Sequence, residues 1–213
     1  MPGLFISFEG PDGSGKSTQI TLLSFFLRQE GYKVITTREP GGTIIGEQVR
    51  DCLHDIQNKS MTSAAEVLLY SASRAQLVEE IIRPALASNH IVLSDRYSDS
   101  TLAYQGYGRG LDLNDLTRLT RFATGGLKPE LTFLFDVNIE DGLNRRTDGG
   151  VEMNRMDLQT VDFYRRVRDG YWEMAAANPK RWITIDANRP VNTIQNDVRT
   201  HLMERLEKSA RSI

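Results

Sequence analysis

The segment from Gly10 to Ser17 limits the possible folds of this chain more than any other feature. It reads GPDGSGKS and matches the pattern G-x-x-x-x-G-K-[ST] without a gap. The apolar, strand-like run Leu4–Phe8 precedes it, and apolar residues at helical spacing follow from Lys16 to Glu30, where Gly31 ends the pattern. Glycines let such a loop curl so that its backbone N–H groups point at phosphate oxygens. The sequence therefore predicts a strand–loop–helix unit that binds the phosphates of a nucleotide.

Strand-like apolar runs alternate with helical patterns along the rest of the chain. The further strand candidates are Tyr32–Thr37, Ile91–Leu93, Leu131–Val137 and Trp182–Ile185. The expected helices are Thr62–Ser88 with a kink or break near Pro84, Leu113–Ala123, Thr160–Ala177, and a last one after Pro190. Strands that are apolar throughout and alternate with helices indicate a parallel sheet covered on both faces. We predict an α/β fold of the P-loop NTPase type, a three-layer α/β/α architecture with a five-stranded parallel sheet.

The bulk composition is that of an ordinary globular protein. The chain has 213 residues, 25% of them charged, and a formal net charge of −2. No linker-like stretch divides it, so we expect a single domain over residues 1–213. The charge argues against nucleic-acid or membrane-surface partners. The single cysteine excludes an internal disulfide, and the N-terminus lacks the basic region of a signal peptide, so we expect a cytoplasmic protein.

The phosphate-binding loop indicates a nucleotide but not a reaction. A GTPase would need the guanine-reading motif N-K-x-D after a later strand, and Asn58-Lys59-Ser60-Met61 lacks the aspartate and follows no strand. A motor or a large ATPase would need a longer chain. Mostly small kinases remain, in which the lysine of the loop contacts the β and γ phosphates and its serine can bind Mg²⁺.

Charged residues follow the second and third predicted strands. Arg38 could hold a phosphate, or it could be a solvated residue of a surface turn. Asp95 ends an apolar strand, as the Mg²⁺-binding aspartate of such kinases does, so Ser17 and Asp95 are the predicted metal ligands. Arg96 next to it could bind an acceptor phosphate, or it could form a structural ion pair with Asp95. Asp136 also ends an apolar strand and competes for the metal role, but no basic residue flanks it in the sequence.

Two groups of side chains are suited to binding a base and a sugar. Thr101, Tyr104 and Gln105 offer a hydroxyl, a ring and an amide within about one helical turn, although they could equally be ordinary residues of a helix start. Tyr70 and Arg74 are four residues apart on the long predicted helix and share a face, which would let them stack on and hydrogen-bond to a base. The alternative for this pair is a core tyrosine and a surface arginine.

Residues 145–157, RRTDGGVEMNRMD, have the composition of a mobile lid. Gly149-Gly150 breaks the helical pattern, and arginines lie on both sides of it. A lid of this kind would exclude water and bring positive charge to a transferring phosphoryl group. A flexible surface loop is the alternative. The three histidines match no metal-ligand spacing, and Cys52 is expected to be a packed helix residue.

Several motifs in this order resemble the bacterial type of thymidylate kinase over nearly the whole chain. They are FEGPDGSGKSTQ at residues 8–19, TREPGGT at 37–43, LLYSASRAQLVEEIIRPAL at 68–86, LSDRYSDSTLAYQGYGRGL at 93–111 and DANRP at 186–190. The resemblance implies the fold of the nucleoside monophosphate kinases. It also implies transfer of the γ-phosphoryl group of ATP to dTMP, with Mg²⁺, by a homodimer.

The resemblance also implies roles for individual residues. Those around dTMP would be Arg38, Tyr70, Arg74, Arg96, Ser100, Thr101, Tyr104 and Gln105. Tyr70 would stack on thymine, Arg74 and Thr101 would contact the edge of the base, and Tyr104 would lie where a ribose 2′-hydroxyl would project. Those around ATP would be Gly10, Pro11, Asp12, Gly13, Ser14, Gly15, Lys16, Ser17, Thr18, Arg145, Asn188 and Arg189. The catalytic set would be Lys16, Arg96, Arg155, Asp12 and Arg38.

Gly13 divides the family into subtypes. Some thymidylate kinases carry an arginine at this place in the loop, and glycine cannot supply that charge. The lid should then supply it, through Arg155 and through Arg145 or Arg146. The middle of this lid, DGGVEMN, has no arginine, unlike the lids of some relatives.

Two other functions compete with phosphorylation of dTMP. One is a kinase for a different nucleoside monophosphate or another small acceptor. The other is a regulatory protein that binds nucleotide without turnover, and it would be expected to have lost catalytic residues. Lys16, Ser17, Asp95 and Arg96 are all present, which favours an enzyme.

Overall fold

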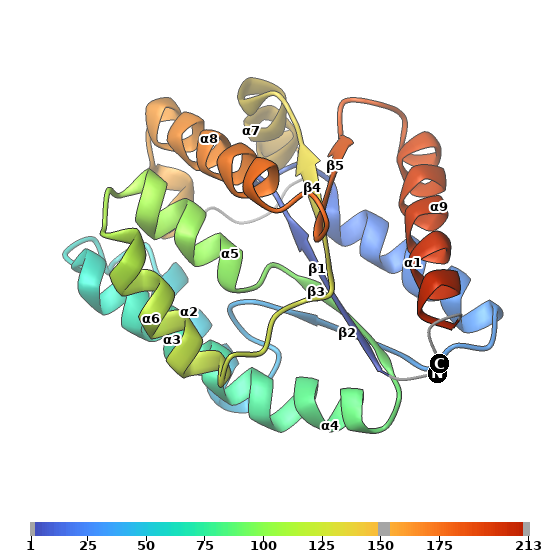
Figure 1. The fold of residues 1–213 in the computed structure, drawn as a ribbon. Helices are drawn as coiled ribbons and strands as arrows, with labels where there is room; N and C mark the ends of the chain where they lie inside the picture. The colour runs from blue at the N-terminus through green and yellow to red at the C-terminus, as the bar shows by residue number, and fades with distance from the viewer. Residues whose placement is uncertain (1–2, 149–153, 211–213) are drawn as a thin grey trace.

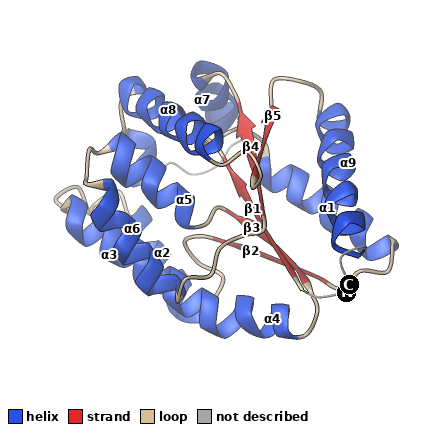
Figure 2. Ribbon diagram, viewed as in Figure 1, coloured by secondary structure: helices blue, strands red, loops and turns tan. Residues whose placement is uncertain are grey.

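A single parallel sheet organises the molecule. The computed structural model describes residues 3–148 and 154–210, and for residues 208–210 the backbone alone. The sheet has five strands in the order β2-β3-β1-β4-β5, and all neighbouring strands run parallel. Figure 2 shows the strands at the centre with helices on both sides, which confirms the predicted three-layer α/β/α fold. The strands are β1 (Leu4–Glu9), β2 (Val34–Arg38), β3 (Ile91–Asp95), β4 (Leu131–Asp136) and β5 (Trp182–Asp186).

Helices connect the strands and cover both faces of the sheet. The α-helices are α1 (Lys16–Gln29), α2 (Ile44–His54), α3 (Ser63–Leu77), α4 (Arg83–Ala87), α5 (Ser98–Thr101), α6 (Leu113–Thr124), α7 (Ile139–Asp148), α8 (Val161–Ala177) and α9 (Val191–Ala210). Two π-helical segments, η1 (Val78–Ile82) and η2 (Leu102–Gly108), and one 3₁₀ turn, η3 (Arg155–Leu158), complete the set. None of the described helices combines the length and the apolarity that a membrane crossing needs.

The central strand β1 sends alternate side chains to opposite faces of the sheet, as the pleat requires. Ile6 and Phe8 are fully buried in a cluster with residues of α1 and α9, such as Leu23 and Val198. Phe5 points the other way and packs with residues of α3, η1 and α4. Figure 1 shows the same arrangement, with α1 and α9 together on one side and the α3–α4 segment on the other.

The carboxyl ends of the strands bring the predicted site residues to one edge of the sheet. Phe8 of β1 and Arg38 of β2 both lie beside Asp95 of β3 in the strand register. The chain leaves β1 for α1 at the middle of the sheet, with β3 on one side and β4 on the other. Ligands of such sheets bind outside the carboxyl ends at this reversal of strand order. The loop Gly10–Gly15 lies there.

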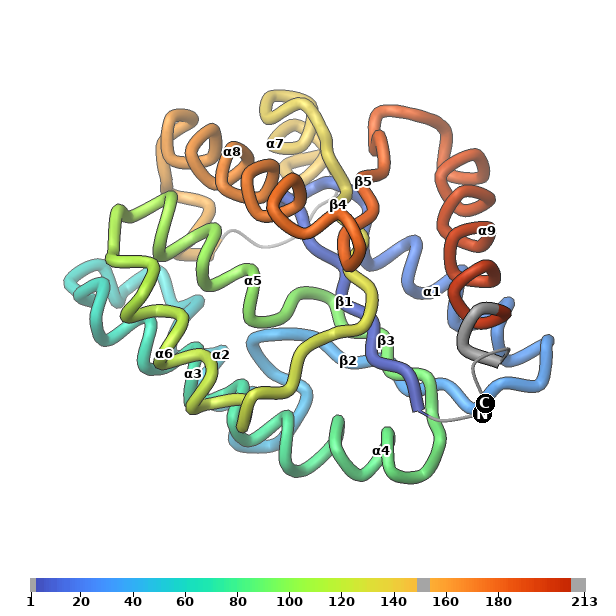
Figure 3. The backbone as a smooth tube through the Cα atoms, in the orientation of Figure 1, coloured from blue at the N-terminus to red at the C-terminus, as the bar shows by residue number. Residues whose placement is uncertain are grey.

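The long helix predicted for residues 62–88 is present, with its irregularity just before Pro84. Helical backbone continues from α3 through η1 into α4, and Figure 3 shows this run without an intervening loop. Pro84 lies in the first turn of α4. Proline donates no backbone hydrogen bond, and its ring displaces the carbonyl four residues earlier, which accounts for the wider π-helical turn of η1.

No bounds for α2, α5 and α7 were predicted from the sequence. Cys52 does lie in a helix, α2, but its side chain is exposed and not packed as expected. Helix α2 begins directly after the Pro-Gly-Gly turn, where the Thr43 side chain accepts a hydrogen bond from the backbone of Gly46. The last residues of helix α7, from Arg145 to Asp148, form the start of the segment predicted to be a lid. Of that segment, residues 149–153 lie outside the described residues, so only its two ends, in α7 and η3, can be placed.

Candidate active site at the carboxyl edge of the sheet

The loop between β1 and α1 has a conformation that depends on its glycines. Gly10, Gly13 and Gly15 have φ angles of +133°, +73° and +86°. Inside the loop, Lys16 Nζ donates hydrogen bonds to the carbonyl oxygens of Gly10 at 3.1 Å and Pro11 at 2.8 Å. Burial and the nearby positive charge of Arg96 lower the pKa of Lys16 to about 8. Phosphate oxygens at this place would raise that pKa again, and the loop before the N-terminus of α1 is a suitable anion site.

Helix α7 packs directly on this loop. A Cβ atom on Gly13 would lie 1.9 Å from the carbonyl oxygen of Gly142 in α7, and one on Gly142 would lie 2.8 Å from the carbonyl oxygen of Asp12. Both obstacles are backbone atoms, which cannot rotate away. The loop can therefore carry no side chain at residue 13 while α7 occupies this position, which explains in physical terms why a loop arginine is missing.

Two aspartates competed for the metal role, and the structure distinguishes them. Asp95 Oδ2 accepts a hydrogen bond of 2.5 Å from Ser17 Oγ in the first turn of α1. Asp136 forms a two-pronged ion pair with Arg168 of α8, with distances of 2.6 and 2.8 Å. No basic residue flanks Asp136 in the sequence, but a distant helix supplies one in space, so the Asp136 carboxylate is already paired. Asp95 and Ser17 are the pair that faces the loop.

The oxygen atoms of Ser17 and Asp95 fit a magnesium ion that is shared with nucleotide phosphates. Mg²⁺ prefers oxygen ligands and is commonly held by one or two protein groups together with phosphates and water. Residues 3–148 and 154–210 contain no group of three or more His, Cys, Asp or Glu side chains that could hold a metal ion.

Arg96 is the most extensively bonded side chain of the site. Its backbone has a φ of +70°, a conformation that non-glycine residues rarely adopt. Nη2 donates to Asp12 Oδ1 at 2.9 Å and to the Tyr104 hydroxyl at 2.8 Å. Nη1 donates to Ser100 Oγ at 3.2 Å and to the Tyr171 hydroxyl at 3.1 Å. Four acceptors thus fix the guanidinium plane at the wall of the site.

The two carboxyl groups near Arg96, the partly exposed Asp12 and the buried Glu9, have opposite electrostatic surroundings. Burial by itself would raise the pKa of Asp12, but the charges of Arg96 and Lys16 outweigh this effect and hold its pKa well below the usual range. Burial, reinforced by the negative charge of Asp99, raises the pKa of Glu9 to about 8. Asp12 is therefore an anion at every physiological pH, whereas Glu9 binds a proton readily.

A cavity of about 520 Å³ extends from the loop to α3, η2 and α2. Arg74 and Thr101 line it, and both side chains are 1% exposed. Arg74 Nε donates to Glu39 at 2.7 Å, but neither Arg74 Nη1 nor Thr101 Oγ1 has a hydrogen-bond partner among the described residues. Buried polar atoms are rarely left unpaired, so these two are candidates for contacts to a ligand. Tyr70 lies in the same wall, as predicted.

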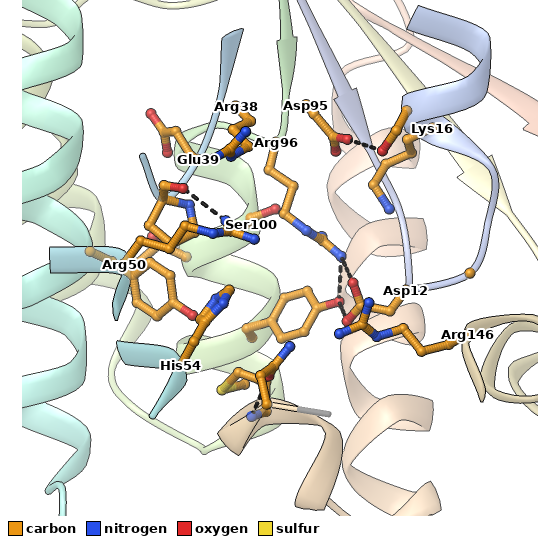
Figure 4. A pocket seen from close by; sticks show the side chains of 18 of the residues that line it. Asp12, Lys16, Arg38, Glu39, Arg50, His54, Asp95, Arg96, Ser100 and Arg146 are labelled. Carbon is orange, nitrogen blue, oxygen red and sulfur yellow. Dashed lines mark hydrogen bonds and ion pairs between the residues drawn. The ribbon is translucent and has the colours of Figure 1, made fainter. Parts of the chain in front are cut away.

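The other predicted acceptor residues also reach this cavity. Arg38 lines it with a half-exposed side chain that pairs with Glu47 at 2.8 Å. Gln105 lines it too, while its Nε2 donates to Glu66 at 2.8 Å. Figure 4 shows Arg38, Asp95, Arg96 and Lys16 around one space. The structure therefore brings together the predicted residues of the phosphate loop, the metal pair and the acceptor side.

The lid arginines divide into two groups. Arg145 and Arg146 of α7 line the cavity, and Figure 4 shows Arg146 close to Asp12. Arg155 of η3 does not line it. Its guanidinium is 7% exposed, pairs with Glu66 at 2.6 Å and donates from Nε to the carbonyl oxygen of Leu53 at 2.9 Å. The structure thus does not bring Arg155 to the phosphate loop.

Asn188 and Arg189, which were predicted to lie around ATP, follow the end of β5 and do not line the cavity. Asn188 Nδ2 donates to Asp186 at 2.8 Å, and Arg189 Nη2 forms an ion pair with Asp197 at 2.5 Å. Arg145 Nη1 donates to the carbonyl oxygen of Ala187 at 3.0 Å, which joins α7 to this loop. An adenine bound between α7 and the loop after β5 would lie on the α7 side of the phosphate loop.

The comparisons with known proteins agree with the motifs. A family model described as thymidylate kinase matches residues 8–198. The chain belongs to the thymidylate kinase family. It is 48% identical to a thymidylate kinase of Geotalea uraniireducens (strain Rf4) over 96% of this chain and 98% of that one, and 46% identical to one of Exiguobacterium sp. (strain ATCC BAA-1283 / AT1b) over 98% of both. A solved thymidylate kinase of Ehrlichia chaffeensis superposes with a TM-score of 0.77 at 36% identity, covering 95% of this chain and 99% of that chain.

Some residues of this thymidylate kinase family site were not found from the sequence. Glu9 and Tyr171 complete the surroundings of Arg96, and Glu66 is a buried acceptor for Gln105, Arg109 and Arg155. A glutamate that ends an otherwise apolar strand, as Glu9 does, was an available signal. Tyr171 and Glu66 had none, because nothing local distinguishes one helix residue that faces a site from one that faces the core.

Proposed function

We propose that the cavity is where this chain carries out the reaction of its family, transfer of the γ-phosphoryl group of ATP to dTMP to give dTDP and ADP. The observation that supports the proposal best is the composition of the cavity wall. Lys16 and Ser17 of the phosphate loop, Arg96, Arg74 and Thr101 all line the same space, and Arg74 and Thr101 each have a polar atom without a partner among the described residues. A donor phosphate at one end and a nucleoside monophosphate at the other would meet between them.

On the acceptor side, each group has a partner in the substrate. Arg96 and Arg38 hold the phosphate of dTMP through charge-assisted hydrogen bonds. Arg74 Nη1 donates to a carbonyl oxygen of thymine, and Thr101 Oγ1 pairs with the neighbouring polar atom of the base edge. The Tyr104 ring, held by the Arg96 bond, leaves less room for a ribose 2′-hydroxyl than for deoxyribose.

On the donor side, Lys16 and the backbone N–H groups of the loop bind the β and γ phosphates. A Mg²⁺ ion held by Ser17 and Asp95 would neutralise charge that develops on the phosphate oxygens. The phosphate oxygen of dTMP attacks the γ phosphorus as the bond to the ADP oxygen breaks. No general base is needed, because that oxygen is already an anion. The protein supplies orientation and positive charge.

We assign the lid charge to Arg146 rather than to Arg155. Arg146 lines the cavity, and its charge acts on Asp12 at the loop. A two-pronged pair with Asp157, at 2.9 Å for both contacts, holds its side chain toward η3. Arg155 instead joins η3 to Glu66 of α3 and so anchors the far end of the lid.

We further propose that the enzyme is a cytoplasmic homodimer. The dimer is supported by large apolar side chains exposed on the neighbouring helices α2, α3 and α6, namely Ile44, Ile45, Leu68, Leu113 and Phe122. A cytoplasmic location agrees with the single, unpaired cysteine and with the use of ATP.

Release of ADP, measured with dTMP, dUMP, UMP, dCMP, dGMP and AMP as acceptors, tests the proposal. We expect kcat/KM to be highest for dTMP, and Lys16→Met to lower kcat by about 10²–10³ while the protein stays folded. Preference for another monophosphate would support the second kinase hypothesis. The absence of turnover with every acceptor would contradict catalysis altogether.

A further inference from the structure

Behind Arg96, Glu9 Oε2 and the hydroxyl groups of Ser100 and Tyr171 form a triangle of short polar contacts, which we call the ring. Ser100 Oγ donates to Glu9 Oε2 at 2.6 Å, the Tyr171 hydroxyl donates to the same oxygen at 3.0 Å, and the two hydroxyls lie 2.8 Å apart. The three side chains come from β1, α5 and α8, which are distant in sequence. Glu9 is fully buried and does not itself line the cavity.

Both hydroxyls of the ring also bind Arg96. Each accepts a hydrogen bond from Nη1, at 3.2 Å for Ser100 and 3.1 Å for Tyr171. A hydroxyl has one proton, so it can accept from the guanidinium only if its own proton points elsewhere. Within the ring, each of these protons has a hydrogen-bond acceptor. Arg96 therefore depends on the ring for half of its acceptors.

The carboxyl group of Glu9 is the member that makes this proton arrangement possible. Its Oε1 accepts a hydrogen bond of 2.8 Å from the backbone N–H of Tyr97, which leaves Oε2 to face the two hydroxyls. As a carboxylate, Oε2 accepts from both hydroxyls. As a carboxylic acid, Oε2 donates to Tyr171, Tyr171 donates to Ser100, and Ser100 donates back to Oε2. In either state both hydroxyls keep a lone pair toward Arg96.

An amide at the same place could not do this. The Tyr97 N–H would hold the amide oxygen at the Oε1 position, so the NH₂ group would face Ser100 and Tyr171. An NH₂ group only donates. The proton of one hydroxyl could still point to the oxygen of the other hydroxyl. The proton of that other hydroxyl would then have no acceptor and would point at Nη1 of Arg96, which is itself a donor. The arrangement thus requires an acceptor at the Oε2 position, not a particular charge.

We propose that Glu9, acting through Ser100 and Tyr171, is a positioning residue for Arg96. Together they hold the guanidinium so that its Nη2 edge faces Asp12, Tyr104 and the acceptor phosphate. This inference rests on the proposed role of Arg96 in binding the phosphate of dTMP. The four acceptors of the Arg96 guanidinium come from the phosphate loop, α5, η2 and α8. By holding Arg96, the ring therefore also fixes the distance between the donor and acceptor sides.

The test is a double-mutant cycle on kcat/KM for dTMP at saturating ATP. Glu9→Gln and Tyr171→Phe are each combined with Arg96→Ala. We expect each single change to lower kcat/KM for dTMP by about tenfold, the size of effect typical of one hydrogen bond to a charged group. The KM for ATP should change by less than twofold. In the Arg96→Ala background the same two changes should have almost no further effect, because the group through which they act is gone.

Tyr164→Phe is the matched control for Tyr171→Phe. Tyr164 is on the same helix, is 1% exposed, and donates its hydroxyl to the carbonyl oxygen of Met156 at 2.9 Å without touching Arg96. It should leave kcat/KM for dTMP within about twofold of the parent chain. If Glu9→Gln does not fold, Tyr171→Phe carries the cycle by itself.

Two results would overturn the inference. One is a wild-type value of kcat/KM in Glu9→Gln and Tyr171→Phe. The other is an equal loss in the presence and absence of Arg96, which would mean that the ring acts through general stability. The proposed function would fail separately, either because the parent chain does not phosphorylate dTMP or because Arg96→Ala retains full activity.

Discussion

At the scale of single residues, the cavity wall contains two unpaired polar atoms, Arg74 Nη1 and Thr101 Oγ1. We expect them to lower the stability of the free protein and to bind the base of the substrate. Each is buried without a hydrogen-bond partner among the described residues. An unpaired buried polar group costs about 1–3 kcal/mol. The charge of Arg74 is neutralised by Glu39, so only one edge of its guanidinium carries this cost. In the free protein these two atoms lack hydrogen bonds, which a bound base would supply.

Thr101→Val should separate the two effects. Valine keeps the branched shape but removes the hydroxyl, so kcat/KM for dTMP should fall by about 5- to 30-fold. The same change removes an unsatisfied group, so the melting temperature should not fall. Steady-state kinetics with dTMP and thermal unfolding of the free protein measure the two quantities.

Thr124→Val is the control for this substitution. Thr124 is also buried, but its hydroxyl donates to the carbonyl oxygen of Thr120 within α6, away from the cavity. It should leave kcat/KM for dTMP unchanged and should not raise stability. A loss of stability in Thr101→Val with unchanged kinetics would show that the hydroxyl serves the fold and not the base.

At the scale of elements, α7 packs directly on the phosphate loop, and under the proposed mechanism this contact brings the lid charge to the reaction. The loop and the helix touch through backbone atoms at Gly13 and Gly142. Arg145 and Arg146 come three and four residues after Gly142, which is about one helical turn. The tight contact thus places the lid arginines beside the loop. A family member with an arginine in the loop needs a different spacing between these two elements.

Gly13→Ala should inactivate the enzyme for a steric reason, and Gly126→Ala provides the comparison. Both residues have positive φ, +73° and +77°, so both substitutions carry the backbone cost of about 1–2 kcal/mol. Only Gly13 meets an obstacle, since a Cβ atom on Gly126 would have nothing within 4 Å. We expect Gly126→Ala to lower stability modestly and keep kcat, whereas Gly13→Ala loses far more of both. Equal effects of the two, in unfolding and turnover assays, would mean that α7 moves aside easily.

The two ends of the lid should respond differently to loss of an arginine. Arg146→Ala should lower kcat by about 10²–10³, as expected for a positioned charge on the transferring group. Arg155→Ala should lower the free energy of unfolding by roughly 1–3 kcal/mol, because Glu66 loses one of its buried partners, and should lower kcat by less than tenfold.

Asp157→Asn is the control for Arg146→Ala, since it weakens the Arg146–Asp157 pair but keeps the positive charge. It should retain most of kcat. Turnover of the three variants at saturating substrates, together with their unfolding curves, decides the assignment. A large loss of kcat in Arg155→Ala alone would return the catalytic role to the residue first predicted from the sequence.

The elements differ in how far the sequence could predict them. Local patterns located all five strands and the phosphate loop, because an apolar run followed by GPDGSGKS depends on neighbouring residues alone. The ion pair of Asp136 could not be predicted, because its partner, Arg168, is 32 residues away. The place of Arg155 was equally hidden, since it depends on Glu66 and Leu53 from other helices. Contacts made by tertiary packing leave no periodic signal in the chain.

At the scale of the whole molecule, polar and apolar surfaces lie in different places. The cavity at the carboxyl edge is lined mainly by charged and hydroxyl side chains. Exposed apolar side chains gather on α2, α3 and α6, which Figure 1 shows together on the side of the molecule away from α1 and α9. Since α3 and η2 also form the cavity wall, an interface on α3 would lie directly behind the acceptor site and would restrain it.

Phe122→Lys should therefore convert a dimer into a monomer. Phe122 on α6 is 86% exposed, more than any other large apolar side chain described, and a charge there would be buried at the interface without a partner. Phe25→Lys on α1 is the matched control, because Phe25 is 62% exposed but lies on the opposite side. Light scattering should give twice the chain mass for the parent and for Phe25→Lys, and the single chain mass for Phe122→Lys. The monomer should also bind dTMP more weakly, since α3, which carries Tyr70 and Arg74, would lose its support. A parent protein with the mass of one chain would refute the dimer, and the exposed apolar residues would then need another explanation.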